Sequence, residues 1–302
     1  MEFGLILPQG WLNSIRSMEE IEKIAKHAEE LNFNSLYAYD HLLPYEKYSS
    51  IEDPILECWT LLSALIGITD RIKLGQVVLC NSYRNPALVA KMGATFSYLS
   101  NNRLEFGIGA GWYEEEYYRF GYQFPSIKDR LEQLEESLQI IKGLWEYGRL
   151  KFDGKHYKID AICNPKPDKI KIMVGGSSKR LIKIASKYAD RYNHPFGTPE
   201  EVREKVRLLR EYNKDVEASI LLRAIIGSKE EIDAIANRLK DDDESIEDYL
   251  KRVKDYTLIG NNSIELLNRY RDAGVTHFII HLFGLEDNID SMDRLKDIIN
   301  KL

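Results

Sequence analysis

Short apolar runs alternate with helix-like apolar stripes along the whole chain, and this alternation predicts an α/β protein with a parallel sheet covered by helices. Eight apolar runs can be counted, and a helical pattern follows each of them. Eight such units within 302 residues favour a closed (β/α)8 barrel with small insertions over an open doubly wound sheet. We therefore expect a single domain that spans residues 1–302.

The first half of the chain supplies the first four strands. Residues 72–79 form a nearly continuous apolar and β-branched run, which is typical of a strand buried on both faces. Ser17 to Glu20 has the spacing of a capping box, and Pro86 stands where a helix can begin. The strands expected here are 3–7, 35–39, 72–79 and 104–108. The helix after the first strand ends near Leu31, the helix after the second spans about 54–68, and the helix after the third spans 86–99.

The second half supplies four more strands and two insertions. An apolar stripe from Leu131 to Leu144 predicts a long helix after the fourth strand. Residues 150–159 indicate a hairpin around Asp153 and Gly154, and residues 240–256 indicate a charged, helical insertion near the seventh unit. The remaining strands are expected at 170–174, 190–193, 218–226 and 276–282, and the helices at 179–188, from Pro199, after a capping box at 228–231, and at 288–302.

Charge and cysteine content exclude several classes of protein. A net charge of −6 argues against nucleic acid or an anionic membrane as the main partner, because both bind basic surfaces. No apolar run approaches the roughly 20 residues that span a bilayer, and the N-terminus lacks the features of a signal peptide. The three cysteines, Cys58, Cys80 and Cys163, are scattered, which predicts a reduced cytoplasmic protein without disulfides and without a metal site.

Residues 103–116, with the sequence RLEFGIGAGWYEEE, are the most informative stretch. Gly107, Gly109 and Gly111 alternate at the end of an apolar strand, where glycine lets the backbone approach a ligand without a clashing Cβ. The aromatic and acidic residues that follow would suit a wall against a planar, hydroxyl-bearing cofactor. A glycine-rich turn with a packed Trp112 is the other interpretation, and this segment alone leaves both open.

A barrel of this kind carries its site at the C-terminal ends of its strands. Three of the six histidines are expected there: His41, His194 and His281. A lone histidine at a strand end usually caps a backbone group, but three on one rim favour a functional site. His41 is the strongest candidate, because imidazole titrates near neutrality and the adjacent Asp40 can hold or tune it. Asp40 has a second interpretation as the cap of a following helix.

Gly175, Gly176, Ser177 and Ser178 stand where the fifth strand meets a helix. Free N–H groups without Cβ obstruction, together with two hydroxyls, favour a phosphate cradle. A tight turn with a serine N-cap is the alternative. The glycines of the fourth strand do not form the dinucleotide pattern GxGxxG, and the chain has no GxxxxGK[ST], HExxH or GxSxG motif.

Taken together, these segments resemble the bacterial-luciferase-like superfamily, specifically its branch dependent on coenzyme F420, an 8-hydroxy-5-deazaflavin. The resemblance covers essentially the whole chain. It rests on Tyr39-Asp40-His41, on 74–78 leading to Arg84-Asn85-Pro86, on 99–104 running into the alternating glycines, Trp112 and Glu116, and on Gly175-Gly176 followed by 189–193.

The resemblance implies a TIM barrel that binds the deazaflavin at its C-terminal face. It implies a non-prolyl cis peptide at Val77-Val78 behind the ring, and catalytic roles for His41, in proton transfer, and Asp40. The residues that it places at the cofactor are Asp40, Val77, Val78, Cys80, Gly109, Gly111, Trp112, Glu116, Gly175, Gly176, Ser177 and Ser178.

The activity implied by the resemblance is hydride transfer between C5 of the deazaflavin and an unidentified small organic substrate. Related sugar-phosphate dehydrogenases carry a glutamate where this chain has Trp112, so a glucose-6-phosphate-type reaction is not favoured. An FMN-dependent luciferase-like monooxygenase and a non-catalytic cofactor-binding relative are the alternatives.

Two further expectations concern assembly and the rim of the barrel. Barrels of this family commonly pair through helices near the second and third units, so we expect a homodimer with Trp59, Leu62 and Leu65 near the interface. Residues 42–52 and 240–256 are candidate lids. Four aromatic residues at the rim either line a pocket or pack ordinarily: Trp11, Tyr45, Trp112 and Tyr113.

Overall fold

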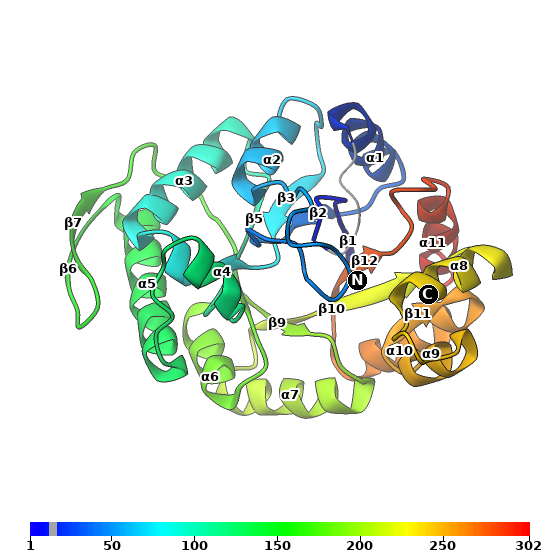
Figure 1. Cartoon of the computed structure of the whole chain (residues 1–302). Coiled ribbons are helices and arrows are strands. Elements are labelled where there is room, and N and C mark those ends of the chain that lie inside the picture. Colours follow the sequence, from blue (N-terminus) through cyan, green and yellow to red (C-terminus); the bar gives the residue numbers. More distant parts are fainter. Residues whose placement is uncertain (12–16) are drawn as a thin grey trace.

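Backbone pairing closes the eight main strands into a barrel, because β9 pairs with β10 as well as with β8. The structure is a computed structural model that describes residues 1–11 and 17–302. Neighbouring barrel strands are parallel, and helices surround them (Figure 1). The barrel strands are β1 (Glu2–Ile6), β2 (Ser35–Ala38), β3 (Lys73–Gln76) continued by β4 (Leu79–Cys80), β5 (Leu104–Gly109), β8 (Ile172–Gly175), β9 (Arg191–Pro195), β10 (Glu217–Ile225) and β12 (His277–Leu282).

The helices begin where the sequence supplies side-chain caps. Ser17, Thr198 and Ser228 each accept the backbone N–H three residues on, and the glutamate at that position returns a bond, so all three are capping boxes. The helices are α1 (Met18–Glu30), α2 (Cys58–Leu65), α3 (Pro86–Leu99), α4 (Glu114–Arg119), α5 (Ile127–Tyr147), α6 (Lys179–Tyr188), α7 (Pro199–Tyr212), α8 (Lys229–Leu239), α9 (Ile246–Val253), α10 (Ser263–Asp272) and α11 (Ser291–Ile299), with 3-10 turns at Asn81–Tyr83 and Gly260–Asn262.

Apolar side chains pack in two layers, because successive residues of a strand point to opposite faces. The outer layer, between strands and helices, includes Leu5 and Leu36. The inner layer fills the barrel and includes Ile6, Tyr37 and Met173. The helices therefore pack against the outer face of the barrel, and the inner layer packs inside it, beneath the strand ends.

The predicted barrel is confirmed, and so is the predicted hairpin at 150–159. The hairpin is the antiparallel pair β6 (Arg149–Asp153) and β7 (Lys158–Ile162), which stands away from the barrel beside α5 (Figure 1). The insertion at 240–256 contains α9 and leads into β11 (Thr257–Ile259). This short strand pairs with the end of β10 beyond the point where the β9 pairing stops.

Three elements differ from the sequence-based expectation. The strand expected at 72–79 is interrupted between β3 and β4, at Val77 and Val78. The helices α4 and α10 were not predicted. Neither has a side-chain hydrogen bond at its N-cap, so the capping signal that marks most of the other helices is missing.

In the described part of the chain, no helix has the length and apolarity that a bilayer crossing requires. Cys58, Cys80 and Cys163 are all buried and unpaired. Burial raises the pKa of each thiol, to about 12 for Cys80, so the three sulfur atoms are protonated at neutral pH.

A buried ion network closes the N-terminal end of the barrel. Arg191, the first residue of β9, lies within 2.8 Å of carboxylate oxygens of Glu2, Glu105 and Glu217. These carboxylates come from β1, β5 and β10, so one guanidinium joins four strands. Lys73 also pairs with Glu105 at 2.8 Å. Lys171 pairs with Glu217 at 2.8 Å, so three basic side chains match three carboxylates, which is the condition under which buried ions are tolerated.

Replacing Arg191 should therefore be costly. We expect Arg191→Met to lower the free energy of unfolding by about 3 kcal/mol, because Glu105 would keep a buried charge with only Lys73 to match it. Arg269→Met is the control, since it removes an exposed pair with Glu200 and should cost less than about 1 kcal/mol. Urea unfolding measures both, and equal losses would contradict the assignment.

Candidate functional site

The interruption of the third strand places Val78 on a floor of glycine. The peptide between Val77 and Val78 is cis, as the resemblance implies. The side chain of Val78 lies over β5 and β8, where a Cβ built on Gly109 or Gly175 would lie 2.8 or 2.9 Å from its carbon atoms. Such contacts are too close for real side chains, so both positions require glycine. Val78 itself remains partly exposed at the strand ends.

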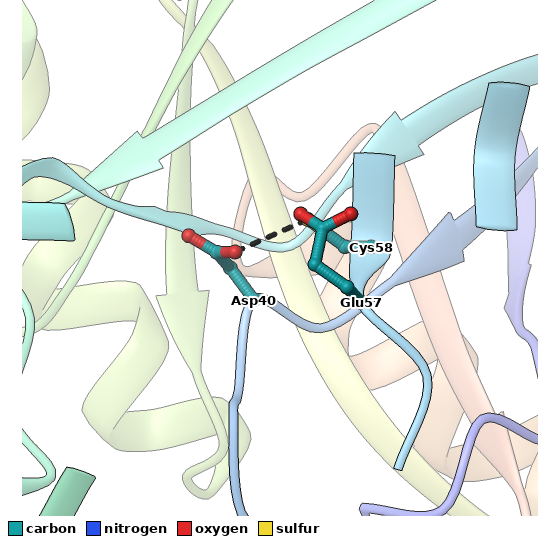
Figure 2. Close-up of side chains that lie close together, drawn as sticks. All are labelled: Asp40, Glu57 and Cys58. Atoms are coloured by element: carbon teal, nitrogen blue, oxygen red, sulfur yellow. Dashed lines mark hydrogen bonds between the residues drawn. The ribbon is translucent and has the colours of Figure 1, made fainter. Parts of the chain in front are cut away.

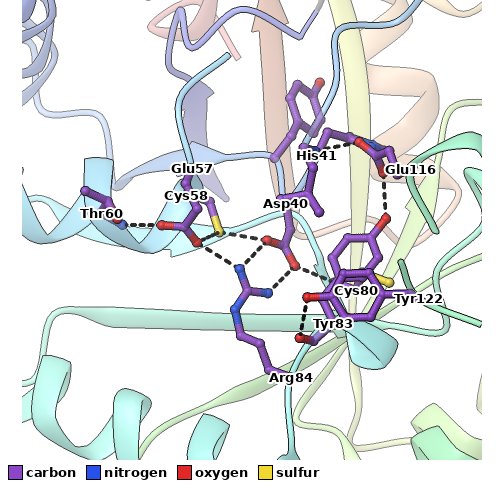
Figure 3. Close-up of polar contacts among 12 residues, drawn as sticks. Asp40, His41, Glu57, Cys58, Thr60, Cys80, Tyr83, Arg84, Glu116 and Tyr122 are labelled. Carbon is purple, nitrogen blue, oxygen red and sulfur yellow. Dashed lines mark hydrogen bonds and ion pairs between the residues drawn. The ribbon is translucent and has the colours of Figure 1, made fainter. Parts of the chain in front are cut away.

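The carboxylate of Asp40 holds this interruption in place. One oxygen accepts the backbone N–H of Cys80 at 2.8 Å, and Arg84 grips both oxygens at 2.7 and 2.9 Å (Figure 3). The Cys58 thiol adds a bond of 3.2 Å. Both oxygens of Asp40 are thus engaged within the protein, and its side chain is buried.

Two groups of potential metal ligands are already neutralised by basic side chains. Asp40, Glu57 and Cys58 lie close together (Figure 2), but Arg84 contacts both carboxylates, at 2.7 and 2.8 Å. The second group is Asp129, Glu132 and His156, where Lys155 and Arg180 contact the carboxylates.

His41 points away from Asp40 and is anchored by Glu116 (Figure 3). Nδ1 of His41 lies 3.0 Å from Oε2 of Glu116. The same carboxylate accepts the N–H groups of Leu42 and Leu43, at 2.6 and 3.1 Å, and the hydroxyl of Tyr83 at 2.7 Å. Burial alone would raise the pKa of Glu116, but the hydrogen bond from His41 and the other donors outweigh burial and lower it.

The ionised state of Glu116 fixes the tautomer of His41. A carboxylate only accepts, so Nδ1 carries a proton whether the ring is neutral or charged. Nε2 is therefore the ring nitrogen that is available to a ligand. No residue of the described chain is hydrogen-bonded to that atom, which leaves it free to exchange a proton with a ligand.

Aromatic rings surround His41. Trp11 stacks on the imidazole with centroids 3.4 Å apart and planes at 3°. Trp112 and Tyr113 meet it edge-on at 5.8 and 6.1 Å, and Tyr45 packs on Trp11. These contacts confirm that the four aromatic rim residues come together, and Trp112 remains 58% exposed at their edge.

The segment Gly175 to Ser178 forms the turn that enters α6. Gly176 has φ of 146°, which disfavours other residues, and Ser178 caps the helix by accepting Leu181 N–H at 3.2 Å. Ser178 is therefore the N-cap of α6, whereas the phosphate cradle stays a prediction. Ser177 is exposed and has no hydrogen-bond partner in the part of the chain that the structure covers.

The three rim histidines do not converge. His281 faces into the barrel, where its Nδ1 lies 2.9 Å from the hydroxyl of Tyr39. His194 instead bonds Tyr192, which belongs to the outer layer, and packs near Gly197. The expectation for His194 was wrong because the alternation of β9 turns its side chain outward. Burial lowers the pKa of His194 to about 4, so this ring is neutral.

Sequence reasoning gave no site role to Arg84, Tyr83 or Tyr39. Arg84 lies in the segment Arg84-Asn85-Pro86, which carries part of the resemblance, so a signal was present. Tyr39 likewise lies in Tyr39-Asp40-His41, which also carries the resemblance, whereas Tyr83 had no signal beyond its place at a strand end. Glu116 was expected to contact a cofactor, and the structure shows it binding His41 and the backbone after β2.

An anchored histidine and a glycine-backed floor thus both lie at the strand ends, where TIM-barrel enzymes carry their active sites. A family model described as luciferase-like monooxygenase matches residues 1–283, and the chain belongs to this family.

Sequence relatives carry two kinds of activity in their names. A pyrimidine monooxygenase, RutA, of Acinetobacter baylyi is 30% identical; the match covers 65% of this chain and 56% of that protein, so the chain spans only part of this relative's length. An F420-dependent glucose-6-phosphate dehydrogenase of Amycolatopsis mediterranei is 25% identical over 94% of both chains.

Solved structures show the same fold. An F420-dependent secondary alcohol dehydrogenase, in complex with an F420–acetone adduct, has a TM-score of 0.83 at 20% identity and covers 99% of this chain and 98% of its own. An EDTA monooxygenase from Chelativorans has a TM-score of 0.80 at 15% identity, over 100% of this chain and 93% of its own.

The anchoring of His41 can be tested through stability. We expect Glu116→Gln to lower the free energy of unfolding by about 2 kcal/mol at pH 7, because an amide cannot accept all four donors. The pKa of Glu116 is lowered from 4.5 in the folded state, so its contribution is complete above that value and disappears as pH falls below it.

The measurement is urea unfolding at pH 7 and at pH 3.5. The difference between wild type and Glu116→Gln should shrink at the lower pH. Glu115→Gln is the matched control, because Glu115 pairs only with Arg119 on the surface. A difference that is independent of pH would contradict the role of the ionised carboxylate.

Proposed function

We propose that the protein is an oxidoreductase that uses coenzyme F420 to transfer a hydride to or from a small organic substrate. The observation that carries the proposal is the carboxylate-anchored His41 at the same end of the barrel as the glycine-backed Val78. The relative that matches 94% of the chain and the solved structure that matches 99% are both F420-dependent by name, which supports this cofactor.

The residues at the strand ends fit a planar ring. Val78 is partly exposed on glycines whose Cβ atoms would collide with it, so it presents an apolar surface at a fixed height. The first turn of α6 has N–H groups without helical acceptors, beside the unpartnered Ser177, which suits a phosphate. We assign the ring to Val77, Val78, Cys80, Gly109, Gly111 and Trp112, and the phosphate to Gly175, Gly176, Ser177 and Ser178.

When bound, the cofactor supplies the hydride chemistry. The chain supplies the proton: Nε2 of His41 gives a proton to the reduced substrate oxygen or nitrogen, or takes one in the reverse direction. Glu116 keeps the imidazole oriented, and the stacked Trp11 shields one face of it from water. We assign Asp40 a positioning role, because its oxygens already bind Arg84 and Cys80.

The second candidate is an FMN-dependent monooxygenase. It is favoured by the 30% identity to a pyrimidine monooxygenase and by the description of the family model as luciferase-like monooxygenase. A ring with carbon at position 5 does hydride chemistry and reacts poorly with oxygen, so the identity of the cofactor separates the two functions.

The cofactor can be identified by titration of the apoprotein. We expect oxidised F420 to bind, with a change in ring fluorescence, and FMN to bind at least tenfold more weakly. Tight FMN binding without a response to F420 would establish the second candidate instead.

The role of His41 is tested with the conservative variant His41→Asn. The amide nitrogen can still donate to Glu116, but the variant has no counterpart of Nε2. Turnover of reduced F420 with a responsive enone, imine or ketone should fall more than tenfold, about 1.4 kcal/mol in the barrier, with unchanged F420 affinity. The control is His27→Gln, which alters another histidine–carboxylate pair, with Asp293, in the last turn of α1. Equal rates in the two variants would exclude His41 from catalysis.

We further propose a homodimer in the reducing cytoplasm, in keeping with the unpaired thiols. A recess of about 470 Å³ between α2 and α3 is lined by Trp59, Met92, Phe96 and Leu99 among others. Leu62 and Leu65 are fully buried in the outer layer, so of the three residues expected near the interface only Trp59 lines this recess.

The dimer is tested at Leu99, which is 61% exposed beside this recess. A charge there should oppose burial against a second chain, so Leu99→Glu should shift the sedimentation profile from dimer to monomer. Ile162→Glu is the control, because Ile162 is equally exposed on the hairpin. Wild-type protein that sediments as a monomer would refute the proposal.

A further inference from the structure

The inside of the barrel contains a guanidinium that proton transfer at His41 does not use. Arg223 lies on β10 between Leu221 and Ile225. Both of these residues belong to the inner layer, and side chains alternate along a strand, so Arg223 also faces inward. It is in register with His281 of β12, which faces inward as well.

Arg223 has no anionic partner in the described chain, 1–11 and 17–302. Its Nε is buried without a hydrogen bond, and the guanidinium lies 4.7 Å from the ring centroid of Phe196. Arg84 and Arg191, by contrast, each contact two or more carboxylates. Arg223 is partly exposed, so an anion from solvent can reach it. An unpaired guanidinium inside the barrel therefore indicates a place for an anion supplied from outside.

His281 provides a second unpaired donor at the same place. Its side chain is buried, and Nε2 has no partner among the described residues. Burial lowers the pKa of His281 to about 3, so the ring is neutral. Tyr39 has no other hydrogen-bond acceptor in the described segments, so its hydroxyl donates to Nδ1 at 2.9 Å. The ring proton is then on Nε2, which is a buried donor.

We propose that Arg223 and His281 bind a carboxylate, or a small oxoanion of similar shape, carried by the substrate. The guanidinium can donate two parallel N–H bonds to such a group, and Nε2–H of His281 a third. The ring of Tyr39 lies 5.8 Å from that of His281 and 6.3 Å from that of His41, between centroids. An anchored substrate would thus extend across Tyr39 towards the proton-transfer residue. The proposal rests on the proposed function and adds the substrate class, a small organic anion.

The test uses benzoate as the probe and benzamide as its uncharged counterpart, each titrated by calorimetry into the full chain without cofactor. Benzoate should bind wild type, benzamide should not, and Arg223→Met should bind benzoate at least tenfold more weakly. Arg269→Met removes a surface guanidinium and should leave benzoate affinity unchanged. Absence of benzoate binding to wild type, or equal affinity in wild type and Arg223→Met, would overturn the proposal.

Two further measurements exclude misfolding and identify the source of the anion. Arg223→Met should unfold at no lower urea concentration than wild type, since it removes an unpaired charge, and Arg223→Lys should show intermediate affinity. With F420 bound, continued benzoate binding assigns the site to the substrate. Competition between F420 and benzoate would assign Arg223 to the cofactor phosphate and overturn the proposal. The apoprotein titration needs no turnover, so it stands apart from the test of hydride transfer.

Discussion

The bidentate pair between Arg84 and Asp40 is the constraint on which the strand ends depend. The third barrel strand loses its regular ladder after Gln76 and resumes at Leu79. Asp40, from the neighbouring strand, replaces a ladder bond by accepting the N–H of Cys80, and Arg84 makes the buried carboxylate tolerable. Without that charge balance, the interrupted strand would have no fixed path across the barrel.

Adjacent residues after β2 divide the work of building the site. Asp40 turns towards the third strand and fixes the height of Val78, whereas His41 turns the other way and is fixed by Glu116 (Figure 3). Both carboxylates are buried and satisfied by several donors, so neither is a free acid or base. The reactive position is left to the imidazole, and the two carboxylates provide rigidity around it.

Much of this architecture could be predicted from the sequence, because the spacing of apolar residues and the N-cap residues of helices both indicate local structure. All eight strands and the hairpin follow from such patterns. Long-range pairs could not be predicted in this way. Nothing in the local sequence shows that Glu116 contacts a histidine 75 positions away or that Arg84 contacts a carboxylate 44 positions away. His194 was misplaced because strand-end position alone does not tell which face a side chain takes. The alternating glycines were singled out for close approach to a ligand, and the structure places Gly109 against Val78 of the same chain.

The three buried, protonated thiols have a practical consequence. Cysteine-directed reagents such as maleimides need an accessible thiolate, which none of these residues offers in the folded chain. A single cysteine introduced in the rim segment 42–52 or in the β6–β7 hairpin would then be the reactive thiol. Fluorescent or spin labels could follow loop movement in the otherwise natural sequence, with no need to delete a native sulfur.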